Sequence, residues 1–288
     1  MPSITNWTIS GWRGLPIYGN THHPDPGPPP RGVILLVHGF MGYKDYGLFP
    51  FVAEQFAVAG VIAHRFNLTT SGITENFQTF ERPDLFELGT WSNNVTDIDA
   101  VIDAVEQGTL AGRGRGMILM GHSRGGVGVL LAAGRRFMEG RKAVPVGVIS
   151  ASAPSRPWRF AQSQKQEILD RGFLEVKSSR TGQDLRVGRA FLDEQIADPQ
   201  AHDIARHVAA LRCPLLVVHG TADPTVPPRD ASEIAAMAGE AIPHRLELVE
   251  GGDHVFNTPN PFPMNGAPSP QLQAFLQSMM RFSDEVLA

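Results

Sequence analysis

The chain is poor in cysteine, and it has no long hydrophobic run and no excess of charge of one sign. Cys213 is the only cysteine among 288 residues, so a disulfide within the chain is excluded. A single cysteine fits a reducing compartment, and we expect a cytoplasmic protein. No apolar run approaches the roughly 18 residues that indicate a membrane span, and residues 1–7 lack the basic and apolar regions of a secretory signal. The sequence therefore predicts no membrane partner.

The charge balance argues against other partners as well. A formal net charge of −4 gives no reason to expect binding to nucleic acid or to an anionic membrane. Hydrophobic residues make up 42% of the chain, which is enough to build a sizeable core. Chains of this length with an α/β fold often form one unit, and no internal repeat divides this one. A homo-oligomer is compatible with this composition.

A candidate nucleophile stands in residues 121–125, Gly-His-Ser-Arg-Gly, which match the pattern G-x-S-x-G. Residues 117–120 are apolar and predict a buried strand before it. Small or apolar residues follow at helical spacing, namely Val127, Leu130, Leu131 and Gly134. The serine therefore falls on a tight turn between strand and helix, at the positive end of the helix. This context predicts that Ser123 is a nucleophile.

A serine hydroxyl needs a base, and the base needs an orienting acid; the expected chain order is serine, acid, histidine. Asp223 follows the apolar segment 215–218, and His254 follows the next apolar segment, near 246–249. Both therefore come just after strands, where open α/β sheets build their sites. We predict Asp223 as the acid and His254 as the base. The alternative acid is Asp253, next to His254.

Acyl transfer also needs donors for the negative oxygen of its intermediate. Residues 33–37 predict a strand that ends in His38-Gly39-Phe40, and the glycine allows the main chain to turn toward the serine. We predict that the main-chain N–H groups of Phe40 and Arg124 form this oxyanion hole.

Other histidines are interpreted as structural. His219 is expected to be packed at a strand end, while His202 and His207 stand five apart in an expected helix and favour surface or capping roles. His22 and His23 have no matching carboxylate or cysteine pattern, so we expect no metal site. No cofactor is implied by the sequence.

Strands alternate with helices over most of the chain, which predicts a mostly parallel sheet flanked by helices. Residues 4–19 predict a hairpin before this alternation begins. A helix is expected from about 92 to 107, with Gly108 as its stop signal, and Leu272, Phe275, Leu276 and Met279 predict a closing helix.

The motifs around His38, Ser123, Asp223 and His254 together resemble serine esterases of the α/β-hydrolase superfamily over nearly the whole chain. Within it, the chain resembles most the bacterial cinnamoyl/feruloyl esterases and the dienelactone-hydrolase-like groups. Dienelactone hydrolases proper use a cysteine nucleophile, and Ser123 departs from them. The esterases commonly carry Asp-x-x-Gly-x-Gly-x-Ser after the fourth strand, whereas this chain has residues 67–72 and a longer stretch up to residue 89.

The resemblance implies an α/β-hydrolase core at residues 1–153 and 209–288 and a small cap insertion at residues 154–208. The inserted segment interrupts the alternation, and residues 174–177 and 184–187 predict a polar hairpin within it. We expect the substrate pocket to include Trp158 and Phe191 from this segment and Phe77 from the stretch before residue 89.

The resemblance further implies a catalytic triad of Ser123, Asp223 and His254 that cleaves a small-molecule carboxylic ester, as in a carboxylesterase. The same triad serves thioesterases, acyl-peptidases and amidases, which remain alternatives. An alternative of another class is a non-catalytic binding protein with the hydrolase fold.

Overall fold

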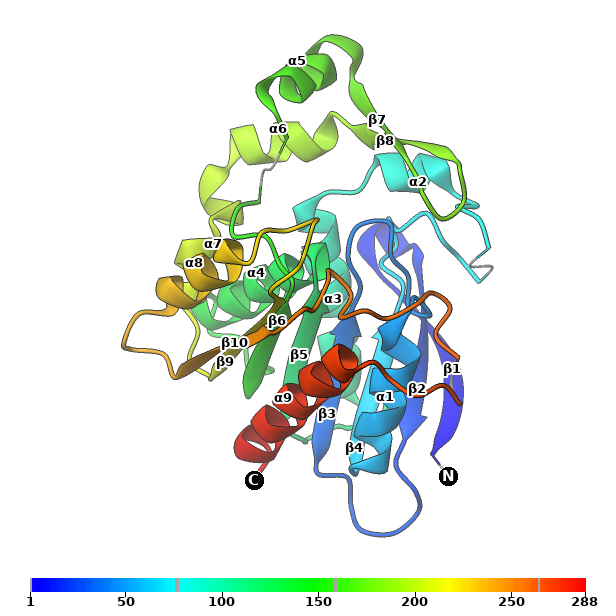
Figure 1. Ribbon diagram of the computed structural model, residues 1–288, viewed down its shortest axis with the longest axis vertical. Helices are drawn as coiled ribbons and strands as arrows, with labels where there is room; N and C mark the ends of the chain where they lie inside the picture. The colour runs from blue at the N-terminus through cyan, green and yellow to red at the C-terminus, as the bar shows by residue number, and fades with distance from the viewer. Residues whose placement is uncertain (1, 76–77, 158–159, 264) are drawn as a thin grey trace.

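The computed structural model describes residues 2–75, 78–157, 160–263 and 265–288. Within these ranges an eight-stranded sheet has the strand order β1-β2-β4-β3-β5-β6-β9-β10 (Figure 1). Its strands are β1 (Ser3–Ser10), β2 (Pro16–His23), β3 (Gly32–Val37), β4 (Val61–Phe66), β5 (Met117–His122), β6 (Gly147–Ala151), β9 (Leu215–Gly220) and β10 (His244–Val249). A second, two-stranded sheet pairs β7 (Phe173–Lys177) with β8 (Asp184–Gly188).

Helices connect these strands. The α-helices are α1 (Leu48–Val58), α2 (Pro83–Glu87), α3 (Trp91–Gln107), α4 (Arg124–Met138), α5 (Gln162–Arg171), α6 (Ala190–Ala197), α7 (Ile204–Ala209), α8 (Arg229–Ala238) and α9 (Pro270–Val286). Two short 3-10 helices are η1 (Trp12–Gly14) and η2 (Pro199–His202). The predicted hairpin at 4–19 is confirmed as β1 and β2 with η1 between them.

The sheet is antiparallel at one edge and parallel elsewhere. β2 pairs antiparallel with β1 and β4, whereas the pairs from β4 through β3, β5, β6 and β9 to β10 are parallel. The predicted mostly parallel sheet flanked by helices is thus confirmed. Because parallel strands end at one edge, the loops after β3, β5, β9 and β10 converge there.

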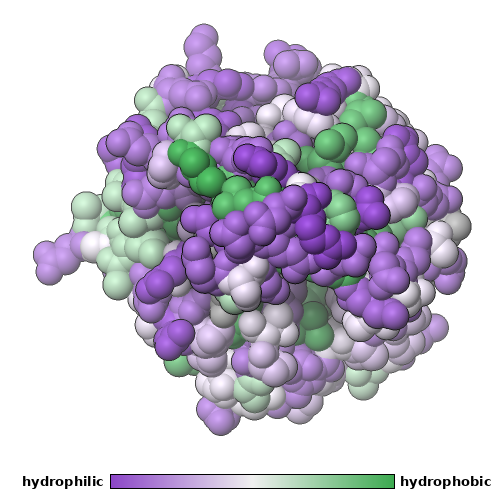
Figure 2. Space-filling view, turned by 90° about the horizontal axis from the view of Figure 1, so that it is seen from above, coloured by the Kyte–Doolittle hydropathy of each residue, from purple (hydrophilic) through white to green (hydrophobic). Residues whose placement is uncertain are grey.

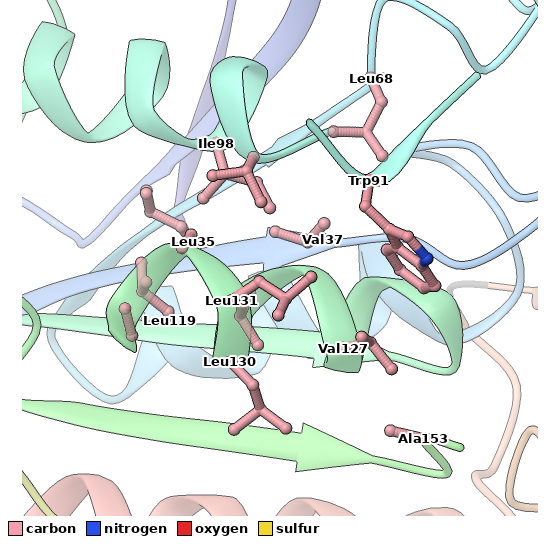
Figure 3. Packing of buried hydrophobic residues seen from close by; sticks show 14 of the residues in the cluster. Leu35, Val37, Leu68, Trp91, Ile98, Leu119, Val127, Leu130, Leu131 and Ala153 are labelled. Atoms are coloured by element: carbon pink, nitrogen blue, oxygen red, sulfur yellow. The ribbon is translucent and has the colours of Figure 1, made fainter. Parts of the chain in front are cut away.

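The parallel strands β3, β4, β5, β6 and β9 are buried on both faces, as expected when helices cover both sides of a sheet, whereas the edge strand β10 is mostly half-buried or exposed. In β3, Leu35 and Val37 join the core under α3 and α4, whereas Ile34 and Leu36 face the core under α1 and α9. Figure 3 shows the first of these cores, where side chains of α4 pack on those of β3 and β5. The alternation follows from successive side chains of a strand pointing to opposite faces.

Local signals set the ends of α3. Thr90 caps its first turn, with the Thr90 side chain accepting a hydrogen bond from Asn93 N. Gly108 ends it at a φ of 82°, a left-handed conformation that glycine adopts without strain. In between, the carboxylate of Asp97 accepts hydrogen bonds from Trp12 N at 2.7 Å and Thr69 N at 2.8 Å. Asp97 thus ties α3 to the loops after β1 and β4.

Between β6 and β9 the chain forms α5, β7, β8, α6, η2 and α7, and Figure 1 shows α5, α6 and the β7–β8 hairpin above the main sheet. The predicted hairpin within this segment is confirmed by the pairing of Leu174 with Val187. α2 packs against β8, and α7 packs against α4 and α8. Seen from this side, hydrophilic residues cover most of the surface, with small hydrophobic patches between them (Figure 2).

Two histidines differ from their predicted surroundings. His202 and His207 lie in the separate helices η2 and α7, and both side chains are buried rather than at the surface. Their Nδ1 atoms bond the main-chain carbonyls of Asp198 at 3.1 Å and Asp203 at 2.7 Å. The two short helices pack inward, which the spacing of the residues along the chain did not reveal.

No helix within the described ranges has the length and apolar character to cross a bilayer.

Candidate active site

Ser123 lies at the turn between β5 and α4. Its main chain has φ 55° and ψ −123°, a conformation rare for any residue other than glycine, so the turn is strained. The turn is held because Ser123 N donates a hydrogen bond of 2.7 Å to Ala151 O, at the end of the neighbouring strand β6. The side chain of Ser123 therefore projects at the converging ends of the strands, as the sequence predicted from the strand–turn–helix pattern.

Two glycines of the motif are required by close approach of the main chain. A Cβ added to Gly121 would lie 2.1 Å from Gly125 O, and one added to Gly125 would lie 2.4 Å from Val37 O. Neither neighbour is a flexible side chain that could move aside. Any larger residue at these positions would therefore displace the turn that carries Ser123.

Asp223 and His254 meet at the same edge. Asp223 follows β9, His254 follows β10, and His254 Nδ1 lies 2.8 Å from Asp223 Oδ2. The other carboxylate oxygen of Asp223 accepts hydrogen bonds from Thr225 N at 2.8 Å and Val226 N at 2.9 Å. Burial raises the pKa of this carboxyl, but hydrogen bonds from His219, His254 and Val226 N outweigh burial and hold the pKa well below its usual value. Asp223 is therefore ionised at neutral pH.

Asp253, the alternative acid, and His219, expected to be structural, both lie close to the Asp223–His254 pair. Asp253 Oδ1 accepts hydrogen bonds from Val255 N at 2.9 Å and Asn257 N at 2.6 Å, so this side chain shapes its own loop. His219 is packed at the strand end, as expected, and its Nε2 lies 2.9 Å from Val226 O. The same Nε2 is 3.1 Å from Asp223 Oδ2. Because a carbonyl only accepts, Nε2 of His219 carries the proton and also faces the carboxylate.

His122, directly before the serine, holds the main chain of the His254 loop. Its Nε2 donates a hydrogen bond of 2.7 Å to His254 O, and the two rings lie 4.9 Å apart between centroids. Burial lowers the pKa of His122 to about 3, so the ring is neutral and remains a donor to this carbonyl at neutral pH. This contact had no signal of its own in the sequence, because His122 occupies a variable position of the motif.

The two residues predicted to supply oxyanion donors lie in segments next to Ser123. Arg124 is the first residue of α4, where a main-chain N–H has no partner within the helix. Phe40 follows Gly39, which is pressed against the serine: a Cβ on Gly39 would lie 2.9 Å from Ser123 Cβ. The loop after β3 and the start of α4 are therefore adjacent at Ser123.

Ser123 and His254 line one cavity of about 200 Å³ together with Phe40, Tyr46 and residues 178–180. Residues 178–180 belong to the turn between β7 and β8, so the segment after β6 forms part of the wall. Arg180 in this turn lies with Cζ 4.8 Å from the ring centre of Tyr43. The sequence predicted the hairpin but did not show that its turn lines the same cavity as Ser123.

Of the three residues expected to line the substrate pocket, Phe191 is the one that the structure describes. Phe191 does not line this cavity; its buried ring lies 4.6 Å from the Arg124 guanidinium. Phe77 and Trp158 lie outside the described residues. Within the described ranges, no group of three or more histidine, cysteine, aspartate or glutamate side chains could hold a metal ion.

The model of the family described as "Alpha/beta hydrolase family" matches residues 34–265. The chain therefore belongs to the alpha/beta hydrolase family, and by family and fold it is a hydrolase, which confirms the predicted relationship. No curated protein matches the sequence.

Solved structures share the fold at low identity. Est1E from Butyrivibrio proteoclasticus with ferulic acid bound is 20% identical, has a TM-score of 0.68, and is matched over 98% of this chain and 99% of its own. A putative hydrolase from Agrobacterium vitis S4 is 19% identical, with a TM-score of 0.71 and 100% of both chains covered. A dienelactone hydrolase from Anabaena variabilis is 15% identical, with a TM-score of 0.60 and 99% and 98% covered. At these identities the likeness shows the fold alone.

Proposed function

We propose that the chain is a serine hydrolase that cleaves carboxylic esters through an acyl-enzyme intermediate. The observation that carries the proposal is the 2.8 Å contact between the buried Asp223 and the half-buried His254, beside a strained serine whose cavity His254 also lines. The likeness to Est1E, solved with ferulic acid bound, supports a carboxylic acid as the acyl part.

In the proposed mechanism Ser123 Oγ attacks the ester carbonyl while His254 Nε2 takes its proton. The ionised Asp223 accepts the Nδ1–H of His254, fixes the ring tautomer and stabilises the imidazolium. The N–H groups of Phe40 and Arg124 bind the negative oxygen of the tetrahedral intermediate. His254 then gives its proton to the leaving alcohol, and a water molecule hydrolyses the acyl-enzyme by the same steps.

Labelling with a fluorophosphonate tests the nucleophile. Intact-protein mass spectrometry should show one adduct, and peptide mapping should place it on Ser123. Ser123→Ala should keep its thermal transition, lose the adduct and lose nearly all hydrolysis. An adduct on another residue, or full activity of Ser123→Ala, would refute the proposal, and a chain with no adduct and no turnover would be a binding protein.

A substrate panel tests the bond that is cleaved. We expect the highest kcat/KM for p-nitrophenyl and feruloyl esters, and lower values for matched thioesters and anilides. A higher kcat/KM for thioesters or for acyl-peptides would instead identify a thioesterase or an acyl-peptidase with the same nucleophile.

A further inference from the structure

The side chain of Arg124 is enclosed by aromatic rings next to the nucleophile. Its Cζ lies 4.8 Å from the ring centre of Trp91, 4.6 Å from that of Phe191 and 5.7 Å from that of Phe40. Aromatic faces attract a cation, but they do not replace the hydrogen-bond acceptors that its N–H groups need. Nε and Nη2 of Arg124 are buried, and neither has a hydrogen-bond partner among the residues that the structure describes.

Arg124 keeps its charge in this position. Burial lowers its pKa to about 10, which leaves the guanidinium protonated at neutral pH. Glu194 is the carboxylate that acts on this charge, but Glu194 already accepts hydrogen bonds from Trp91 N at 2.6 Å and Ser92 N at 3.2 Å. The guanidinium thus lacks a bonded counter-ion within the described ranges, although a buried cation with unmatched donors is unfavourable.

Other buried arginines of the chain are paired. Arg136, 1% exposed, donates to Asp99 and Asp103 at 2.6 Å each, and Arg65 is bonded to Asp45. The fold therefore satisfies buried guanidinium groups with carboxylates elsewhere. At Arg124, by contrast, Nε and Nη2 have no acceptor among the described residues.

A second cavity adjoins this guanidinium. It measures about 30 Å³ and is lined by Arg124 together with polar residues of the loop after β4 and of α3, namely Thr70, Ser71 and Asn94. Its volume exceeds the roughly 10–15 Å³ that one water molecule needs, so it has room for a small polar group. Gly39, Phe40 and Met41 line both this cavity and the cavity of Ser123, so the two cavities meet at the loop that carries the proposed oxyanion donor.

We propose that the second cavity is a subsite for a carboxylate carried by the substrate, with the Arg124 guanidinium as its cationic ligand. A guanidinium donates two parallel hydrogen bonds to a carboxylate, which would satisfy the unmatched donors. The preferred substrates are then anionic esters, with the carboxylate on the acyl part reaching past Phe40. This inference rests on the proposed function, because it requires Ser123 as the nucleophile.

Matched pairs of esters test the subsite. The pairs are p-nitrophenyl hexanoate with mono-p-nitrophenyl adipate, and p-nitrophenyl octanoate with mono-p-nitrophenyl suberate, which differ in a terminal methyl or carboxylate. Phenyl acetate with 4-carboxyphenyl acetate tests a carboxylate on the alcohol part instead. We expect a higher kcat/KM for the anionic member of at least one acyl pair. A preference confined to the alcohol pair would place the carboxylate on the leaving group, and neutral preference in every pair would overturn the proposal.

Arg124→Gln should lower the anionic-to-neutral ratio of kcat/KM by about 10- to 100-fold, the loss expected for a charge-assisted hydrogen-bonded contact. Arg124→Lys keeps the charge and should recover part of the ratio. The control is Arg186→Gln: Arg186 is exposed on β8, stacks on Phe173 at 4.1 Å and should leave the ratio unchanged. If Arg124→Gln lowers both members of each pair equally, the residue has only a structural role.

The same assays separate this inference from the proposed function. A wild-type chain that forms no fluorophosphonate adduct on Ser123 refutes the proposed function. A chain that forms the adduct and cleaves neutral esters, but whose ratio does not respond to Arg124→Gln, refutes the carboxylate subsite alone.

Discussion

Asp223→Asn is the most specific test of the proposed site, because both oxygens of this carboxylate have hydrogen-bond partners. Asp223 Oδ2 faces His254 Nδ1 at 2.8 Å and His219 Nε2 at 3.1 Å. Oδ1 accepts the N–H groups of Thr225 and Val226 at 2.8 and 2.9 Å. In the variant only the amide oxygen can accept these two N–H groups, so the amide NH₂ must face the histidines.

The expected loss follows from this orientation. An NH₂ group beside His254 Nδ1 makes that nitrogen the acceptor, and the ring proton moves to Nε2. Nε2 can then no longer take the proton of Ser123. A wrong tautomer of this kind lowers kcat by ~10⁴-fold, or about 5 kcal/mol at 1.36 kcal/mol per tenfold change.

The assay is kcat on p-nitrophenyl acetate with the rate of fluorophosphonate labelling in parallel, since both need the activated serine. Asp253→Asn is the matched control: its amide oxygen can still accept from Val255 N and Asn257 N, so we expect kcat within a few-fold of wild type. Thermal unfolding of both variants shows whether either has lost its fold. If Asp253→Asn proves the more damaging change, the acid is wrongly assigned.

Three further predictions test other parts of the molecule. Gly39→Ala adds a Cβ 2.9 Å from Ser123 Cβ, and it should lower kcat while the urea midpoint changes little; an unchanged kcat would contradict the close approach. Burial raises the pKa of Asp97 to about 6, so the folded protein binds this proton more tightly than the unfolded chain does. The free energy of unfolding should therefore fall by about 3 kcal/mol, through this group alone, as the pH rises from about 4 to 6. Urea titrations across this pH range measure the difference in unfolding free energy between wild type and Asp97→Asn. This difference should change with pH by the same amount, and a constant difference would refute the raised pKa. Phe191→Ala removes a buried ring beside Arg124 and should lower the unfolding free energy by about 3–5 kcal/mol; a loss under about 1 kcal/mol would contradict its packing role.

The architecture could be predicted because its signals are local. Runs of apolar residues at 33–37 and 215–218 indicate strands buried on both faces, and the structure has them as β3 and β9. Gly108 ends α3 where predicted, since glycine alone adopts its φ of 82° freely. The chain order of Ser123, Asp223 and His254 places each after a parallel strand, and the fold brings such positions to one edge.

Contacts that depend on tertiary packing were outside the reach of the sequence. The position of His122 in the motif does not say that its ring bonds the carbonyl of His254, because that requires the loop after β10 to lie beside β5. The turn at 178–180 is recognisable as a hairpin turn, but its place on the wall of the Ser123 cavity depends on how the segment after β6 folds back. The surface or capping role predicted for His202 assumed one helix that also holds His207. The structure has two short helices there, and helices so short offer no periodicity that would reveal a buried face.

Arg124, the residue after the proposed nucleophile, would have two roles that can be separated by mutation. The main chain of Arg124 is fixed as the first turn of α4, and any residue other than proline could supply its N–H to an oxyanion. The side chain is not needed to supply this N–H, and its guanidinium packs against the rings of Trp91 and Phe191. A change of this side chain can therefore alter which substrates are bound while the geometry of the serine turn is retained. This separation is why the ratio between anionic and neutral esters, rather than activity on either alone, reports on the guanidinium.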